Sequence, residues 1–311
     1  MLTYLLRRFV LLLLMLAGAS LVLFALSTLS PVDPAEAAIR VNAMVPTPEL
    51  IEETRRAFGL DQPFWTRYAH WATGLLRGDL GRSWATGLPV AESLAAAFPA
   101  TLKLAAASLL IILGVSIPAA VASSRAQNSP FDHALRAFIF LSSSMPAFWA
   151  ALLLMDLFAV EWRLLPTSGM DRPGSIILPA VSLSLAYVGT YMRLIRAEML
   201  HSAHEDWVVF ARGRGLSEAR ITVELVWSSL RGTAAALGMS IPKLVAGAFV
   251  IEVIFAWPGV GRLCVEAVFN RDLPVIAAYV LIMAALYGLF ILASEAALIL
   301  WDPRERERRL S

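Results

Sequence analysis

Two short stretches of this chain resemble catalytic motifs, and each lacks a residue that the chemistry needs. His204-Glu205-Asp206-Trp207-Val208 begins like the zinc-protease motif H-E-x-x-H, but Val208 occupies the position of the second metal ligand. Gly238-Met239-Ser240-Ile241-Pro242 resembles the nucleophile motif G-x-S-x-G but ends in Pro242. The ATP-binding loop G-x-x-x-x-G-K-[ST] does not occur. The sequence therefore predicts no catalytic residue, no cofactor and no ATP site of that kind.

Metal ligands do not cluster along the chain. Of the four histidines, only His201 and His204 are close in sequence, and a solvated helix face explains such a pair more simply than a metal site does. The single cysteine, Cys264, excludes an intrachain disulfide bond and a thiolate metal cluster. We therefore expect no metal site, and Cys264 is interpreted as an inert packed thiol.

The clearest functional signal is a polar stretch between two apolar runs. It covers residues 205–217, between the apolar runs 175–191 and 233–255, and contains Arg212 and Arg214. Such a stretch does not lie in hydrocarbon, so it must project into water as two short helices. Gly215 permits a tight break between them, although an ordinary glycine that caps the C-terminal end of a helix explains the same residue.

The composition indicates that lipid covers much of the chain. It is 58% hydrophobic and 16% charged, whereas a soluble domain carries about 25% charged residues. A net charge of +2 gives no basis for nucleic-acid binding. A spanning helix needs roughly 20 apolar residues. Six stretches meet this length, at residues 9–29, 100–123, 135–160, 175–195, 233–256 and 275–300.

These stretches predict an all-α integral membrane protein with six transmembrane helices, in which residues 1–311 form one transmembrane domain. The first stretch is about twice as long as the apolar core of a signal peptide, so we expect a retained span. Arginines in the short connections all fall on one side of a six-span arrangement, which the positive-inside rule makes cytoplasmic. Both termini and a loop at 198–232 are then inside, and residues 30–99 form an external cap.

The cap contains two predicted helices. Thr47 is placed to cap a helix that starts at Pro48 and ends at Phe58-Gly59. A second helix is predicted from Pro63 to Arg77, with aromatic residues at helical spacing. We expect this segment to rest on the membrane rather than to form an independent domain.

Ionisable and proline residues within the predicted spans are further candidates for function. Pro118, Pro146 and Pro242 indicate helix kinks, or carbonyl groups freed along a path for cargo. Glu252 lies near the outer end of the fifth span, before the turn Trp257-Pro258-Gly259. We expect Glu252 to hold an outer gate in place, with Pro258 fixing one backbone dihedral and Gly259 freeing the next.

An ordered set of motifs carries a family resemblance over nearly the whole chain. These motifs are Arg7-Arg8, Gly78-Asp79-Leu80-Gly81-Arg82-Ser83, Ser144-Met145-Pro146-Ala147-Phe148-Trp149, Leu165-Pro166-Thr167-Ser168-Gly169, Ile251 to Gly261, and Trp301-Asp302-Pro303-Arg304. Together with the polar loop, they resemble the inner-membrane permease of the peptide/nickel/opine ABC importers. One departure follows the loop, where Ser228-Ser229-Leu230-Arg231-Gly232 replaces the family's usual Asn-Ala-Leu-x-Pro.

The resemblance implies a type I ABC importer permease fold in a bacterial inner membrane. It implies an ATPase-coupling loop, whose matching residues are Glu205, Asp206, Ala211, Arg212, Gly215 and Leu216. It also implies a translocation path with an outer gate, matched by Glu252, Trp257, Pro258, Gly259, Gly261 and Pro146.

The same resemblance implies the partners. They are a second homologous permease, two cytosolic ABC ATPase subunits, a periplasmic or lipid-anchored solute-binding protein, and membrane lipid. Four motifs look closer to nickel and metal–opine permeases than to dipeptide ones, namely Pro46 to Leu50, Leu165 to Gly169, Phe255 to Gly259 and Asn270 to Asp272. They favour nickel or a metal–metallophore chelate as cargo over the alternative, di- and oligopeptides. A stand-alone channel or secondary carrier is a different class that an associated ATPase would reject.

Overall fold

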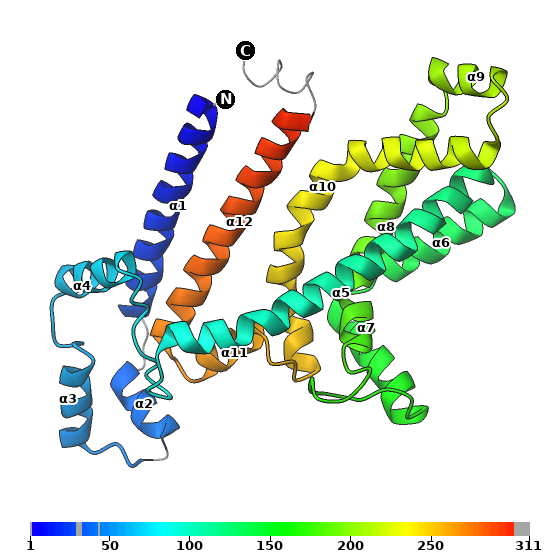
Figure 1. The fold of residues 1–311 in the computed structure, drawn as a ribbon. Coiled ribbons are helices and arrows are strands. Elements are labelled where there is room, and N and C mark those ends of the chain that lie inside the picture. Colours follow the sequence, from blue (N-terminus) through cyan, green and yellow to red (C-terminus); the bar gives the residue numbers. More distant parts are fainter. Residues whose placement is uncertain (1, 29–32, 43, 302–311) are drawn as a thin grey trace. The chain divides into compact units, whose positions relative to one another are not determined.

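The computed structural model describes residues 2–28, 33–42 and 44–301. Across these residues the regular structure is helical, with one isolated β-bridge between Arg82 and Pro89 (Figure 1). The chain divides into two compact units, Met1–Thr101 with Pro258–Ser311, and Leu102–Trp257. Each unit has its own packing.

Two long apolar helices dominate the first unit. Helix α1 (Leu2–Thr28) packs along α12 (Leu273–Trp301), and the two run antiparallel (Figure 1). Gly288 makes this approach possible, because a Cβ at that position would overlap the side chain of Leu12. The outer face of α1 exposes apolar side chains such as Leu14 and Val22. That face is suited to lipid.

The cap of the first unit consists of three short helices, α2 (Pro34–Val41), α3 (Pro48–Ala57) and α4 (Phe64–Leu76). Helix α3 is the predicted one, since the Thr47 hydroxyl accepts a hydrogen bond from Leu50 N–H at 3.3 Å. It ends where Gly59 adopts a φ of +66°. Helix α4 agrees with the prediction for 63–77. Helix α2 was not predicted.

A buried carboxylate attaches the loop after α4 to the rest of the first unit. Asp272 accepts hydrogen bonds from the Ser83 hydroxyl, from Trp84 N–H at 3.0 Å and from Ala85 N–H at 3.4 Å. Beside it, the start of α5 (Val90–Arg125) packs on α11 (Val260–Phe269) and α12 through a buried cluster. The cluster contains Val90, Leu94, Val260, Ala267, Val275 and Ala278. Helix α5 thus begins inside the segment predicted as cap.

The second unit is built around α8 (Ile177–Ser202). It packs on α6 (Pro130–Ser144), on α7 (Ala147–Met155) and on α10 (Glu218–Ile254). Helix α7 continues into a π-helical turn, η1 (Asp156–Glu161), and α8 is followed by the short helix α9 (Asp206–Gly213). Small residues allow these close contacts, because a Cβ at Gly189 of α8 would overlap the Ser143 hydroxyl of α6.

Four helices of the described chain are long and apolar enough to cross a membrane, namely α1, α5, α8 and α12. A fifth candidate is the bent pair α6 and α7–η1, whose axes meet at 98°. Helix α10 covers the predicted fifth span at 233–256, and some side chains between 234 and 239 lie outside the described ones. The all-α membrane class is confirmed, and the count of six spans stays a prediction.

The third predicted span, at 135–160, bends sharply at Pro146 and consists of α6 followed by α7–η1. Met145 is extended, with φ −77° and ψ 135°, because the residue before a proline is driven out of the helical region by Pro146. Pro242, by contrast, is accommodated inside α10, and Pro118 inside α5. The closing motif Asp302-Pro303-Arg304 lies outside the described residues.

Candidate coupling loop and outer turn

The predicted polar loop is a helix–turn–helix at the end of α8. Glu205 is the N-cap of α9 in an extended conformation, and its carboxylate accepts a hydrogen bond from Trp207 Nε1 at 2.9 Å. Asp206 follows in the first turn, where a negative charge favours the helix N-terminus. Both acids are exposed. The local sequence is therefore sufficient to start α9.

Gly215 ends α9 in the geometry that only glycine adopts easily. Its φ is +78°, and its N–H bonds to Arg212 O at 2.9 Å, while Leu216 N–H bonds to Ala211 O at 3.1 Å. This pair of reversed bonds is the Schellman motif, and it satisfies the last carbonyl groups of the helix. The predicted loop residues Ala211, Arg212, Gly215 and Leu216 are thus held together by one backbone motif.

An ion pair spans the same turn. Arg212 Nε donates to Glu218 Oε1 at 2.8 Å, and Ser217 caps α10 by accepting from Arg220 N–H. The hydrogen bond from Arg212 lowers the pKa of Glu218, and the carboxylate raises the pKa of Arg212. Both groups are solvent-exposed, so the pair sets the geometry of the turn and contributes little stability.

Helix α9 presents two apolar side chains to solvent that the sequence reading did not select. Val209 and Phe210 are 66% and 72% exposed, whereas Val208 on the other face is fully buried. These two side chains form a small exposed apolar surface on the loop. The run Val208-Val209-Phe210 does not by itself tell which side chains are buried, and the fold separates them.

The predicted outer turn follows α10. Glu252 and Trp257 are buried, and Trp257 N–H bonds to Glu252 O at 2.8 Å. The left-handed residue of this turn is Ala256, with φ +47°, whereas Gly259 has φ −97°. The chain has therefore already reversed before Pro258, and Gly259 adopts an ordinary extended conformation.

The remaining predicted gate residues lie on separate elements. Gly259 is the N-cap of α11, and the hydroxyl of Thr101 accepts a hydrogen bond from Val260 N–H at 2.9 Å. Gly261 is buried in the first turn of α11. Pro146 precedes α7, which packs on α10.

A buried ionic cluster in the second unit was also missed. Asp132, fully buried at the start of α6, accepts hydrogen bonds from the Ser123 hydroxyl, from Asn128 N–H at 3.1 Å and from Arg196 Nη2 at 3.1 Å. Arg136 Nε lies 3.3 Å from the same carboxylate, outside hydrogen-bonding geometry. This cluster attaches α8 to the hairpin of α5 and α6, close in sequence to the loop.

No group of three or more His, Cys, Asp or Glu side chains lies close enough to hold a metal ion within the part of the chain that the structure describes. His204 Nδ1 is 2.7 Å from Leu200 O, and His133 Nδ1 is 2.8 Å from Ser129 O, as in ordinary helix-surface histidines.

Fold and site define a helical, multi-pass membrane protein with a projecting helix–turn–helix. The family described as "Binding-protein-dependent transport system inner membrane component" matches residues 112–307, and its N-terminal counterpart matches residues 1–105. The chain therefore belongs to this family, the inner-membrane permeases of ABC importers. It is a transport component of the inner membrane.

Relatives with assigned systems fall into two groups. The chain is 34% identical over 308 residues, 99% of each sequence, to the metal-staphylopine import system permease protein CntB of Staphylococcus aureus (strain NCTC 8325 / PS 47). It is 30% identical to the dipeptide transport system permease protein DppB of Escherichia coli (strain K12), covering 99% of this chain and 100% of that one. A putative peptide transport permease of Brucella abortus is 34% identical over 91% of this chain and 92% of that one.

A solved structure shares the fold. It is titled "Crystal structure of an amino acid ABC transporter with histidines", and it aligns with a TM-score of 0.50 and 17% identity over 69% of this chain and 94% of that chain. This likeness supports the permease fold and carries no information on cargo.

Proposed function

We propose that the chain is the translocation subunit of an ATP-driven importer for a metal–metallophore chelate or nickel. The observation that supports this choice of cargo is the 34% identity to the metal-staphylopine permease over 99% of both sequences. The dipeptide permease is matched at 30% over comparable coverage, so di- and oligopeptides are the second candidate.

In this proposal residues 1–311 are one permease domain, residues 30–99 are its periplasmic cap and residues 198–232 its cytoplasmic coupling loop. A second homologous permease completes the path, and a periplasmic or lipid-anchored binding protein delivers cargo to the cap. One of the two cytosolic ATPases docks on α9, where Val209 and Phe210 offer apolar contacts beside the Arg212–Glu218 pair. The chain itself makes and breaks no bonds, and the loop transmits ATPase motion to alternating access.

The coupling role is tested by replacing Gly215 with Val in the assembled transporter. A β-branched residue at φ +78° costs about 1–3 kcal/mol of backbone strain, so the α9–α10 turn should change shape. We expect Gly215→Val to insert normally but to lose ATPase recovery and uptake. Gly213→Val, two residues away without a positive φ, is the control for added bulk. Normal ATPase recovery with Gly215→Val would reject this loop as the coupling element.

The cargo is tested by binding measurements on the solute-binding protein encoded with the permease, followed by uptake assays. We expect binding and uptake of a nickel or metal–metallophore chelate. Binding of dipeptides without any metal complex would favour the second candidate, while leaving the permease assignment intact.

A further inference from the structure

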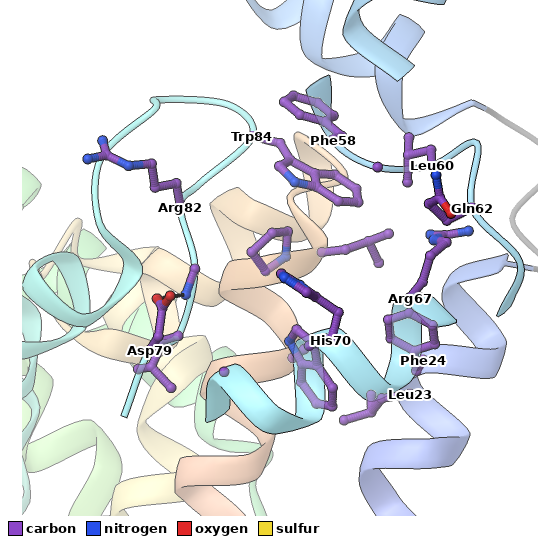
Figure 2. Close-up of a pocket in the computed structure, with 18 of the residues that line it drawn as sticks. Leu23, Phe24, Phe58, Leu60, Gln62, Arg67, His70, Asp79, Arg82 and Trp84 are labelled. Atoms are coloured by element: carbon purple, nitrogen blue, oxygen red, sulfur yellow. Dashed lines mark hydrogen bonds between the residues drawn. The ribbon is translucent and has the colours of Figure 1, made fainter. Parts of the chain in front are cut away.

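A cavity of about 580 Å³ opens in the first unit, where α4 crosses the end of α1 that lies away from its N-terminus. Its walls combine aliphatic and aromatic side chains, with Phe24, Phe58, Trp71 and Trp84 among the lining residues (Figure 2). Phe58 and Trp84 stack with ring centroids 5.0 Å apart. The volume falls in the range of about 300–1,000 Å³ that is typical of small-molecule sites, so it accepts part of an amphipathic molecule.

One wall of this cavity carries a cation. Arg67 extends past the ring of Phe24 towards Gln62, and its Cζ lies 5.5 Å from the ring centroid (Figure 2). Within the described part of the chain, no carboxylate lies within ion-pair distance of Arg67. Partial burial lowers the pKa of Arg67, since desolvation disfavours its charge. An anion at this wall would compensate that cost.

The other charged groups of the cavity are occupied or lie elsewhere. Asp79 accepts a hydrogen bond from Gly81 N–H at 2.8 Å, and Arg82 donates to Gly87 O at 3.0 Å. In Figure 2 Asp79 and Arg82 lie on the opposite side of the cavity from Arg67. The cation is therefore placed at one end of an apolar space, which suits a ligand with one charged end.

Apolar side chains are exposed at this end of the unit. Val22 and Leu26 of α1, which flank the lining residues Leu23 and Phe24, are 58% and 60% exposed. Helix α4 adds an aromatic band typical of a membrane interface, in which Trp65 is 67% exposed. The hydroxyl of Tyr68 in this band forms a hydrogen bond of 2.9 Å with the Ser20 hydroxyl of α1. The cavity thus lies beside an exposed apolar surface, at the end of a helix long and apolar enough to cross a membrane.

We propose that this cavity is a binding site for one anionic phospholipid. The phosphate group accepts hydrogen bonds from the guanidinium of Arg67 and the side-chain amide of Gln62, and one acyl chain starts between the rings of Phe24 and Trp84. Guanidinium groups bind phosphate oxygens through paired, charge-assisted hydrogen bonds, and are less strongly hydrated than ammonium groups. The inference requires membrane insertion of the chain, and is independent of its cargo and of its coupling loop.

Native mass spectrometry of the assembled transporter tests this site. The complex is equilibrated with equal amounts of phosphatidylglycerol and phosphatidylcholine, and the retained lipid is counted. We expect one preferentially retained phosphatidylglycerol per permease, and a loss of that preference by about tenfold in Arg67→Gln, as for removal of one charge-assisted contact. Arg77→Gln is the matched control, because it removes an exposed arginine at the end of the same helix, outside the cavity.

A second variant tests the apolar part of the site. Ala277 lines the cavity from α12, so Ala277→Trp should fill it and reduce retention of both lipids while the complex still assembles. Equal phosphatidylglycerol preference in the wild type and in Arg67→Gln would overturn the proposal. So would displacement of the retained lipid by a metal chelate or a dipeptide, because the cavity would then be a cargo site.

Discussion

Arg196 of α8 donates a hydrogen bond through Nη2 to the fully buried carboxylate of Asp132 at 3.1 Å, which joins α8 to the start of α6. The same guanidinium donates through Nε to the Ser123 hydroxyl of α5 at 2.8 Å. One arginine therefore links three helices immediately before α8 leads into the α9 loop. The positive charge of Arg196, from which the sequence predicted a cytoplasmic location, thus also pairs with the Asp132 carboxylate.

Breaking this link should destabilise the second unit. Arg196→Met leaves Asp132 buried with fewer donors, and loss of one partner from a buried pair costs about 3–5 kcal/mol. We expect the effect near the lower limit, because Ser123 and Asn128 N–H still donate. The midpoint of thermal unfolding in detergent measures it. Arg40→Met, which removes an exposed partner of Glu36, should shift the midpoint little, and an equal shift in both variants would contradict this account.

Ala256 is expected to be the most sensitive position of the outer turn. Its φ of +47° is tolerated by alanine at some cost and poorly by a β-branched residue. Ala256→Val should therefore lose about 1–3 kcal/mol of stability, whereas Ala256→Gly should be neutral or stabilising. Thermal unfolding of the two variants side by side gives the comparison. Equal stability of the Val and Gly variants would show that the turn relaxes without a left-handed residue.

Glu252 is expected to matter for transport more than for assembly. Its side chain is fully buried two residues from the end of α10, immediately before the Phe255–Trp257 reversal. Glu252→Ala should reduce uptake, or separate ATP hydrolysis from uptake, in a complex that still assembles. Glu266→Ala removes a half-exposed carboxylate of α11 and serves as the control. Wild-type uptake and ATPase rates in Glu252→Ala would leave it a structural residue only.

Features that depend on neighbouring residues were predicted correctly from the sequence. Thr47 before Pro48 predicted the start of α3, and Gly215 predicted a turn, because each depends on a few neighbouring backbone groups. Prolines were ambiguous for a physical reason. Pro242 is accommodated inside α10, whereas the helix breaks where the residue before a proline turns extended, as Met145 does before Pro146.

Long-range clusters carried no local signal at all. Asp272 meets Ser83 across 189 residues, and Asp132 meets Arg196 across 64, so their pairing depends on the folded arrangement of separate helices. The sequence also did not show which side chains of α9 are exposed. Val208 is buried, whereas the adjacent Val209 and Phe210 are exposed on this helix of 8 residues. The sequence located the loop, and only the fold separated its packed face from its free face.

Close packing of α6 on α8 gives a further prediction. Alanine at Gly189 would overlap the Ser143 hydroxyl, which is bonded to Ile139 O at 2.5 Å, and its Cβ would lie only 3.0 Å from Ser143 Cβ, which a rotamer change does not move. We expect Gly189→Ala to destabilise the unit by about 1–3 kcal/mol through overpacking. Gly247→Ala on α10 is the matched control, because its Cβ would meet Tyr187 Oη at an ordinary 3.8 Å. It should be neutral or stabilising, since alanine favours a helix, and a loss equal to that of Gly189→Ala would refute the packing argument.

The topology can be tested with thiol labelling, because the native cysteine is protected. Burial raises the pKa of Cys264 to about 11, and only the thiolate reacts. About one Cys264 in ten thousand is then ionised at pH 7, and its labelling rate should rise about tenfold per pH unit towards pH 10. At pH 7, an impermeant maleimide added to intact cells should label Thr54→Cys in the cap and spare Ser217→Cys in the loop. Cell lysis should expose Ser217→Cys to the reagent, and labelling of Ser217→Cys alone in intact cells would reverse the proposed orientation.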